Sequence, residues 1–156
     1  MTGGFYSWDG VKRIRIGFTG TQIGMTNKQA VAVEDLLRKL NPTGGLFRHG
    51  DCTGADYDAH CIVRRLGGWA ICTHPPTEAR KRAWCVADFK WPTRPYLVRN
   101  RDIVDNSDRM VACPKGQTEE LRSGTWSTIR YTRKQGKPLY IVWPDGQVIC
   151  YCHRLL

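Results

Sequence analysis

The sequence lacks a long apolar run and any signal for export. No stretch approaches the roughly 20 consecutive apolar residues that are needed to span a bilayer. The first residues, MTGGFYSWDG, also lack the charged-then-apolar pattern of a secretory signal. These absences argue against a secreted or membrane-spanning protein, so we expect a cytoplasmic protein with no membrane partner.

Cys-x-x-Cys spacing is also missing, although the chain has seven cysteines. An odd count of scattered cysteines favours reduced thiols over a disulfide framework. Cys150, Cys152 and His153 lie close together, but ligands one residue apart on a strand leave a fourth metal ligand unidentified. His49 and His60 are interpreted as too isolated for a ligand pair, so we expect no metal site.

Internal repeats and low-complexity segments are absent as well, and what is present fits one globular unit. The 156 residues are enough for a single domain, which we place over 1–156 with its core at about 12–143. Acidic residues are few, and the formal net charge of +10 predicts an attraction for polyanions. Charge alone does not distinguish nucleic acid from a small phosphorylated ligand.

Apolar periodicity predicts an alternation of strands and helices. Strands are expected over 12–20, 44–50, 69–76, 109–116 and 137–143, and helices over 26–42, 55–68, 96–108 and 124–136. Thr26 or Asn27 is expected to cap the first helix, and the segment 77–95 to form a loop. The turn signal Asp145-Gly146 predicts a C-terminal hairpin. This alternation is typical of an α/β fold with a parallel sheet of about five strands flanked by helices.

Three glycine-bearing loops follow strands of the predicted sheet. They are GTQIG (20–24), HGDCTGAD (49–56) and PKGQTEELRSGT (114–125), and the last two run directly into helices. Loops at the carboxyl ends of parallel strands meet at one edge of a sheet, and the N–H groups at a helix start attract anions. One such glycine usually serves only the backbone geometry of a turn, but the set of three predicts a site for an anionic ligand.

The order of these motifs carries a resemblance. GFTGTQ, HGDCTGADYDAH, RNRDIVDNSDRMVACPKG, SGTWST and GKPLYIV resemble, in this order, the SLOG superfamily of Rossmann-like proteins, particularly its small YspA-type branch. Related groups include the LOG-type phosphoribohydrolases and DNA-processing protein A. The resemblance covers roughly residues 13–142 and implies a Rossmann-like sheet. Family members often pair, so we expect a homo-oligomer.

The resemblance also implies a set of ligand-binding positions. Gly54 would help to cradle a phosphate, Arg99 or Arg101 would clamp it, and the Ser123–Thr125 turn would face the anion. The full set is Gly20, Thr21, Gln22, Gly50, Asp51, Gly54, Ala55, Asp56, Arg99, Asn100, Arg101, Gly116, Ser123, Gly124, Thr125 and Thr128. Asp51, Asp56 and Asp58 could hold Mg²⁺ beside a phosphate, but turn and capping roles explain them without an ion.

One departure from the family pattern concerns catalysis. LOG-type hydrolases carry a glutamate where this chain has Thr128, so cleavage of an N-glycosidic bond lacks its expected carboxylate. Glu119 and Glu120 lie nearby on the loop and could replace it in principle, with Glu120 as the candidate catalytic residue, and whether the protein is an enzyme stays open. The first hypothesis is binding of a nucleotide or nucleotide-derived molecule, as a sensor, carrier or sequestering protein, with no cofactor required. The alternatives are an N-glycosidic hydrolase acting on nucleoside monophosphates or NAD-like nucleotides, and a single-stranded nucleic-acid binder.

Overall fold

Alternating apolar residues and helical apolar stripes build the layered fold that the sequence predicts. The computed structural model describes residues 5–6 and 9–152. The helices are α1 (Asn27–Leu40), α2 (Ala55–Leu66), α3 (Tyr96–Asp105) and α4 (Gly124–Lys134), with a 3₁₀ turn η1 at Ala79–Lys81. The strands are β1 (Phe5–Tyr6), β2 (Lys12–Arg13), β3 (Arg15–Gly20), β4 (Leu46–His49), β5 (Ala70–Thr73), β6 (Phe89–Lys90), β7 (Arg109–Cys113), β8 (Leu139–Val142) and β9 (Val148–Tyr151).

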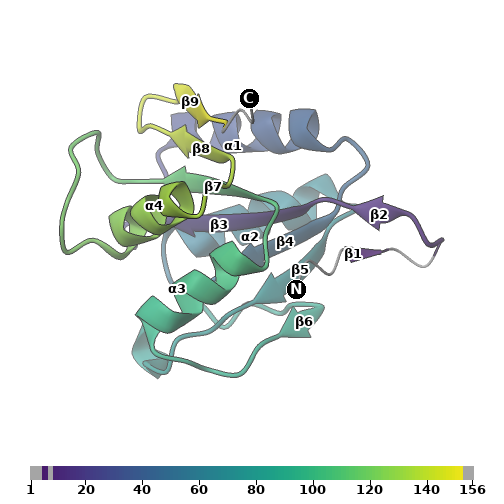
Figure 1. The fold of residues 1–156 in the computed structure, drawn as a ribbon, viewed down its shortest axis with the longest axis horizontal. Helices are drawn as coiled ribbons and strands as arrows, with labels where there is room; N and C mark the ends of the chain where they lie inside the picture. Colours follow the sequence, from purple (N-terminus) through teal and green to yellow (C-terminus); the bar gives the residue numbers. More distant parts are fainter. Residues whose placement is uncertain (1–4, 7–8, 153–156) are drawn as a thin grey trace.

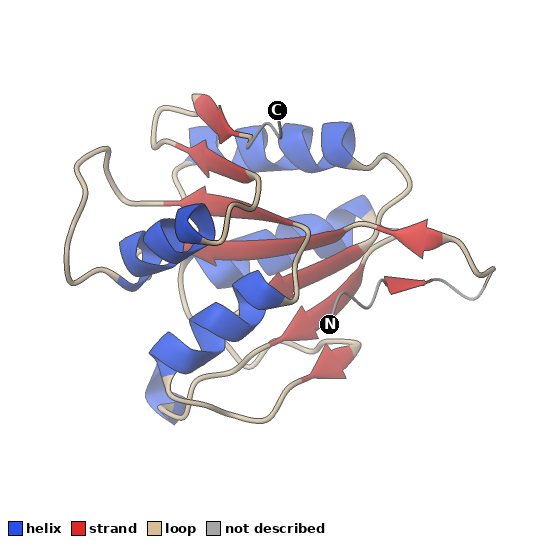
Figure 2. Ribbon diagram, in the orientation of Figure 1, coloured by secondary structure: helices blue, strands red, loops and turns tan. Residues whose placement is uncertain are grey.

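The main sheet has seven strands in the order β6-β5-β4-β3-β7-β8-β9. All neighbours in it are parallel except β8 and β9, which form the predicted C-terminal hairpin. Helices α1 and α2 cover one face of the sheet, and α3 and α4 cover the other (Figure 1, Figure 2). The predicted Rossmann-like α/β class is confirmed. None of the described helices is long and apolar enough to cross a membrane.

The sheet has two more strands than the five expected parallel ones. The second strand of the hairpin, β9, accounts for one of them. The other, β6, comes from the segment 77–95, for which a loop was predicted, and it pairs with β5 at the edge. Its two residues are exposed, so no apolar alternation marks them in the sequence. The predicted strand over 12–20 is also divided, because Lys12 and Arg13 pair with β1 instead of the main sheet.

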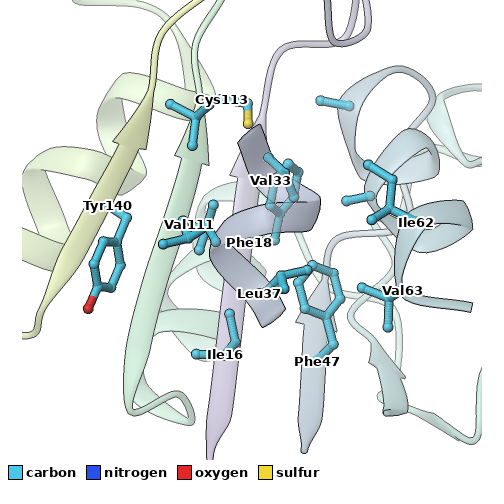
Figure 3. Packing of buried hydrophobic residues seen from close by; sticks show 14 of the residues in the cluster. Ile16, Phe18, Val33, Leu37, Phe47, Ile62, Val63, Val111, Cys113 and Tyr140 are labelled. Carbon is cyan, nitrogen blue, oxygen red and sulfur yellow. The ribbon is translucent and has the colours of Figure 1, made fainter. Parts of the chain in front are cut away.

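The apolar core lies on both faces of the sheet. On the side of α1 and α2, Phe18 and Phe47 from neighbouring strands pack with Val33 and Leu37 of α1 (Figure 3). On the other face, Ile103 and Val104 of α3 and Ile129 of α4 pack over β7 and β8. Helix α1 starts with a capping box, in which Thr26 and Gln29 exchange hydrogen bonds, and this agrees with the cap predicted at Thr26.

The strand order fixes where a ligand can bind. From β3 the chain moves to β4 and β5 on one side of the sheet, and later from β7 to β8 on the other side. The carboxyl ends of β3 and β7 therefore mark the switch point at which the loops diverge and leave a crevice. Gly20 and Cys113, the last residues of these two strands, are register partners.

The core assignment can be tested on α1 with a matched pair of substitutions. Leu37 is fully buried in the cluster, whereas Val31 of the same helix is exposed. We expect Leu37→Ala to lower the free energy of unfolding by about 2–5 kcal/mol, because it removes buried methyl groups and leaves a cavity. Val31→Ala should change that free energy by less than about 0.5 kcal/mol. Urea unfolding of both variants measures the difference, and equal losses would contradict the packing described.

Candidate functional site

A cavity of about 460 Å³ opens at the switch point. Its walls come from the loops that follow β3, β4 and β7, from the segment after β5, from α3, and from the first turn of α4. Ten of the predicted ligand-binding residues line it: Gly20, Thr21, Gln22, Gly50, Asp56, Arg99, Asn100, Ser123, Gly124 and Thr125. The three glycine loops therefore meet at one rim of the sheet.

The loop after β3 is tied to both of its neighbours through its backbone. The Thr21 amide donates to the Cys113 carbonyl at the end of β7, at 3.0 Å, and the Ala55 amide at the start of α2 donates to the Thr21 carbonyl, at 2.9 Å. Gly54, the residue before α2, has a φ of 93°. A Cβ atom on Gly54 would overlap the Gln22 carbonyl. This glycine allows two loops to touch, and neither Gly54 nor Ala55 lines the cavity.

The first turn of α4 brings unpaired N–H groups to the cavity. The side chain of Ser123 caps this helix by accepting from the Trp126 amide, at 3.3 Å. Within the described residues, the amides of Gly124 and Thr125 have no protein acceptor, as expected for the first turn of a helix. Both residues line the cavity, so the positive end of the α4 dipole lies at the site.

Arg99 lines the cavity, but its guanidinium group donates hydrogen bonds to acceptors within the protein. Its guanidinium group is buried and donates to the carbonyls of Gly50 and His74, the latter at 3.2 Å, and to the Cys52 sulfur, also at 3.2 Å. The sequence predicted a phosphate clamp at Arg99 or Arg101. The structure places Arg101 away from the cavity, with its guanidinium 5.3 Å from the centre of the Tyr131 ring.

The acidic residues of the second loop are bound by protein donors. Asp56 is buried and accepts from the Cys52 amide at 3.2 Å. Burial raises the pKa of Asp56 to about 6, although the Arg99 guanidinium opposes that shift. Asp51 is also buried, with a φ of 55°, and its carboxylate accepts from Arg82 Nε and from the Cys85 amide, both at 2.9 Å. Asp58 accepts from the Met25 amide, at 2.9 Å.

The hydrolase position holds no carboxylate in the structure. Thr128 is buried in α4, where its hydroxyl donates to the Gly124 carbonyl at 2.9 Å. Glu120 does line the cavity, but its carboxylate lies 3.3 Å from the ammonium group of Lys115 and is partly exposed. Six predicted residues are not part of the cavity wall: Asp51, Gly54, Ala55, Arg101, Gly116 and Thr128.

Several residues of the wall were missed by the sequence analysis. Lys115 and Arg122 flank the predicted turn before α4, and Tyr96 is the first residue of α3. Lys81, in the segment after β5, also lines the cavity; its basic group was considered as a contact for phosphates but was not included in the predicted set. The Lys81 ammonium group lies 5.7 Å from the centre of the Tyr96 ring. The basic group Arg80–Arg82 was visible in the sequence, but its segment has no period that would place it at the sheet edge.

The interpretation of His49 and His60 as isolated residues is wrong. His49 is the last residue of β4, and its Nε2 lies 3.0 Å from Nδ1 of His60 in α2. The helix runs back along the strand that precedes it, which brings side chains eleven positions apart into contact.

The cysteines divide into two groups. Cys52, Cys61, Cys72, Cys85 and Cys113 are free thiols. Cys150 and Cys152 are joined by a disulfide, which the expectation of reduced thiols did not include. His153, considered with them as a metal ligand, lies outside the described residues.

Comparison with known proteins shows the fold. No family model and no curated protein matches the chain. A molybdenum cofactor binding protein from the phototrophic bacterium Rippkaea orientalis is similar in structure, with a TM-score of 0.67 and 20% identity over 85% of this chain and 77% of that protein. The molybdenum cofactor carrier protein of Chlamydomonas reinhardtii has a TM-score of 0.62 and 17% identity over 83% and 76%. DNA processing protein A from Helicobacter pylori, described with a single-stranded DNA binding mode, has a TM-score of 0.57 and 19% identity over 83% and 65%.

These structures share a Rossmann-like α/β fold with this chain, so the fold that the sequence resemblance implied is confirmed. They also correct one expectation. No cofactor was expected to be required, but two of these structures belong to proteins that bind or carry the molybdenum cofactor. Cofactors therefore belong among the ligand classes that this cavity has to be tested for.

The contact between the first two loops can be tested with two glycines of α2. Gly54→Ala adds a Cβ atom both at a positive φ and against the Gln22 carbonyl. Gly67→Ala, after the other end of α2, adds one at a φ of 71° with no atom within 4 Å. We expect Gly67→Ala to cost about 1–2 kcal/mol of unfolding free energy from the backbone angle alone. Gly54→Ala should cost more in urea unfolding, and equal costs would contradict the loop contact.

Proposed function

We propose that the protein binds a phosphorylated small molecule with a flat ring, either a nucleotide or a phosphate-bearing cofactor, and carries or senses it without turnover. The observation that carries this proposal is the start of α4, where two unpaired backbone amides border a cavity at the switch point. A helix N-terminus with free N–H groups favours a phosphate group. A volume of about 460 Å³ is within the range of small-molecule sites.

The charges around the cavity support an anionic ligand. Its wall holds four cationic side chains, Lys81, Arg99, Lys115 and Arg122, and three acidic ones, Asp56, Glu78 and Glu120. Asp56 is buried, and its raised pKa of about 6 leaves part of its population uncharged in mildly acidic solution. Lys115 and Arg122 flank the α4 start, so a phosphate there would meet backbone amides and side-chain cations together.

A ring can be held beside the α4 start, because the Tyr96 ring lies next to Gly124. Tyr96 begins α3 and is partly exposed, and it lines the cavity together with Pro76 and Ile103. Aromatic and apolar surfaces of this kind bind the faces of planar heterocycles. The molybdenum cofactor proteins of this fold make a cofactor as reasonable a ligand as a nucleotide. Thr128 and the Lys115–Glu120 ion pair give no support to hydrolysis.

The ligand class is tested by extracting the purified protein and identifying any bound molecule by mass spectrometry. In parallel, thermal shift assays compare AMP, adenosine and inorganic phosphate. We expect AMP to raise the melting temperature and adenosine to leave it unchanged, because the α4 amides recognise the phosphate. An equal shift with adenosine would contradict phosphate recognition. Release of adenine from AMP, lost in Glu120→Gln, would instead establish the hydrolase.

A charge-matched pair of variants locates the phosphate. Arg122→Gln removes a cation at the cavity, and Lys134→Gln removes one from the exposed last turn of α4. We expect Arg122→Gln to raise the Kd for AMP by about tenfold, the loss of one charge-assisted hydrogen bond. Lys134→Gln should leave the Kd within about twofold. Equal weakening by both variants, with steep salt dependence for single-stranded DNA, would favour a nucleic-acid surface over this site.

A further inference from the structure

The hydrogen bonds around His49 fix which of its nitrogens carries the proton. The Asp51 amide donates to Nδ1 of His49, at 3.0 Å. A backbone amide can only donate, so Nδ1 holds a lone pair and the proton of the neutral ring is on Nε2. Nε2 therefore donates to Nδ1 of His60, at 3.0 Å. His60 in turn carries its own proton on Nε2.

This arrangement tolerates no additional proton. A proton on Nδ1 of His60 would face the N–H of His49, and a proton on Nδ1 of His49 would face the N–H of Asp51. Each case places two donors against each other at the position of a buried hydrogen bond. His49 is fully buried and His60 nearly so, and neither ring can turn to water without moving its neighbours.

The same cluster has the outline of a metal site, but its protons do not fit one. His49, His60 and Cys85 place three potential ligand atoms within 4.8 Å of one another. A metal on Nε2 of His49 would need the lone pair of that nitrogen while Nδ1 still accepts from Asp51. The neutral ring would then have to lose its only N–H proton and bind as an imidazolate. Metal-bound histidines normally donate from the second nitrogen, which is the opposite of the arrangement here.

The His49–His60 pair is bonded to the loop that forms one wall of the cavity. His49 directly precedes Gly50, and Gly50, Cys52 and Asp56 line the cavity. The Asp51 amide belongs to the same loop, and its carboxylate fixes Arg82 and the Cys85 amide. Loss of the two hydrogen bonds would therefore loosen the loop between β4 and α2 at Asp51, while the Gly50 carbonyl and the Ala55 amide stay bonded to Arg99 and Thr21.

We propose that His49 and His60 form an acid-sensitive latch on the cavity wall, which is closed while both rings are neutral and opens when either is protonated. The charged and titratable groups around the pair are Asp51, Arg64, His74, Cys85, Asp88 and Arg99. Burial is the first cause that lowers the pKa of both histidines, and Arg64 acts in the same direction. Asp51 and Asp88 oppose it at His60.

The direction of the pH effect follows from these lowered pKa values. An unfolded histidine, with a pKa of about 6.5, binds a proton that the folded pair excludes. The stability that the latch contributes is therefore fully present above about pH 6.5 and is lost as the pH falls below it. Asp56, whose pKa is raised to about 6, changes stability in the opposite direction over this range. Its effect cancels when variants at position 60 are compared with the wild type.

Two substitutions of His60 distinguish the effect of the His49–His60 hydrogen bond from the effect of side-chain packing. His60→Asn places an oxygen near the position of Nδ1 and can still accept from His49, whereas the longer side chain of His60→Gln reaches past it. Urea unfolding at pH 7.5 should give His60→Asn a stability close to wild type and His60→Gln a lower one. Between pH 7.5 and 5.5, the unfolding equilibrium constant of the wild type should rise up to about tenfold more than that of His60→Asn.

Hydrogen exchange provides the local measurement. The protection factor of the Asp51 amide should fall between pH 7.5 and 5.5 in the wild type and fall less in His60→Asn. Identical pH profiles for the two proteins would overturn the latch, as would one equivalent of Zn²⁺ that the wild type retains and His60→Gln loses. An effect on ligand release rests on the function proposed above. If AMP does not bind at pH 7.5 and the purified protein yields no phosphorylated molecule on extraction, that function fails, while unfolding and exchange still decide the latch.

Discussion

The ends of β4 and β5 are held against α3 by one buried guanidinium group, that of Arg99. Its hydrogen bonds reach the carbonyl of Gly50 after one strand and that of His74 after the other. Gly50 has no side chain at the point where a Cβ atom would overlap this group. Because both loops form the cavity wall, the shape of the site depends on a cation that is bound inside the protein. Asp56 supplies a nearby negative charge, which explains why a carboxyl group is buried there.

The site therefore has two kinds of positive group, which have different roles. The buried cation shapes the wall, and the groups left for a ligand are the amides of the α4 start and the more exposed side chains of Lys81, Lys115 and Arg122. Backbone amides are fixed in direction, so they favour a particular position of an anion. Long side chains can adapt to different ligands. In the proposed function, such a site would fix the phosphate group through the amides, and the rest of the ligand would be bound by shape and ring contacts.

Local patterns were sufficient to predict the fold and the meeting of the loops. The stripe of Val33, Leu36 and Leu37, the cap at Thr26 and the Asp145-Gly146 turn each depend on neighbouring residues, which the sequence displays. Contacts between distant segments could not be predicted in this way. Nothing near His60 marks His49 as its partner, and nothing in the segment 77–95 shows that Lys81 reaches Tyr96. The hydrogen bonds of Arg99 could not be predicted for the same reason, because its acceptors are main-chain carbonyls that any sequence would offer.

The place of the cavity between β3 and β7 has a consequence for synthesis and folding. One wall comes from the loop after β3 and the other from the start of α4, and about a hundred residues separate them along the chain. The residues of β3, β4 and β5 are therefore synthesised long before the start of α4, which completes the cavity wall. A ligand of the proposed kind would stabilise only the finished domain, so its concentration would affect mature copies and not incomplete ones.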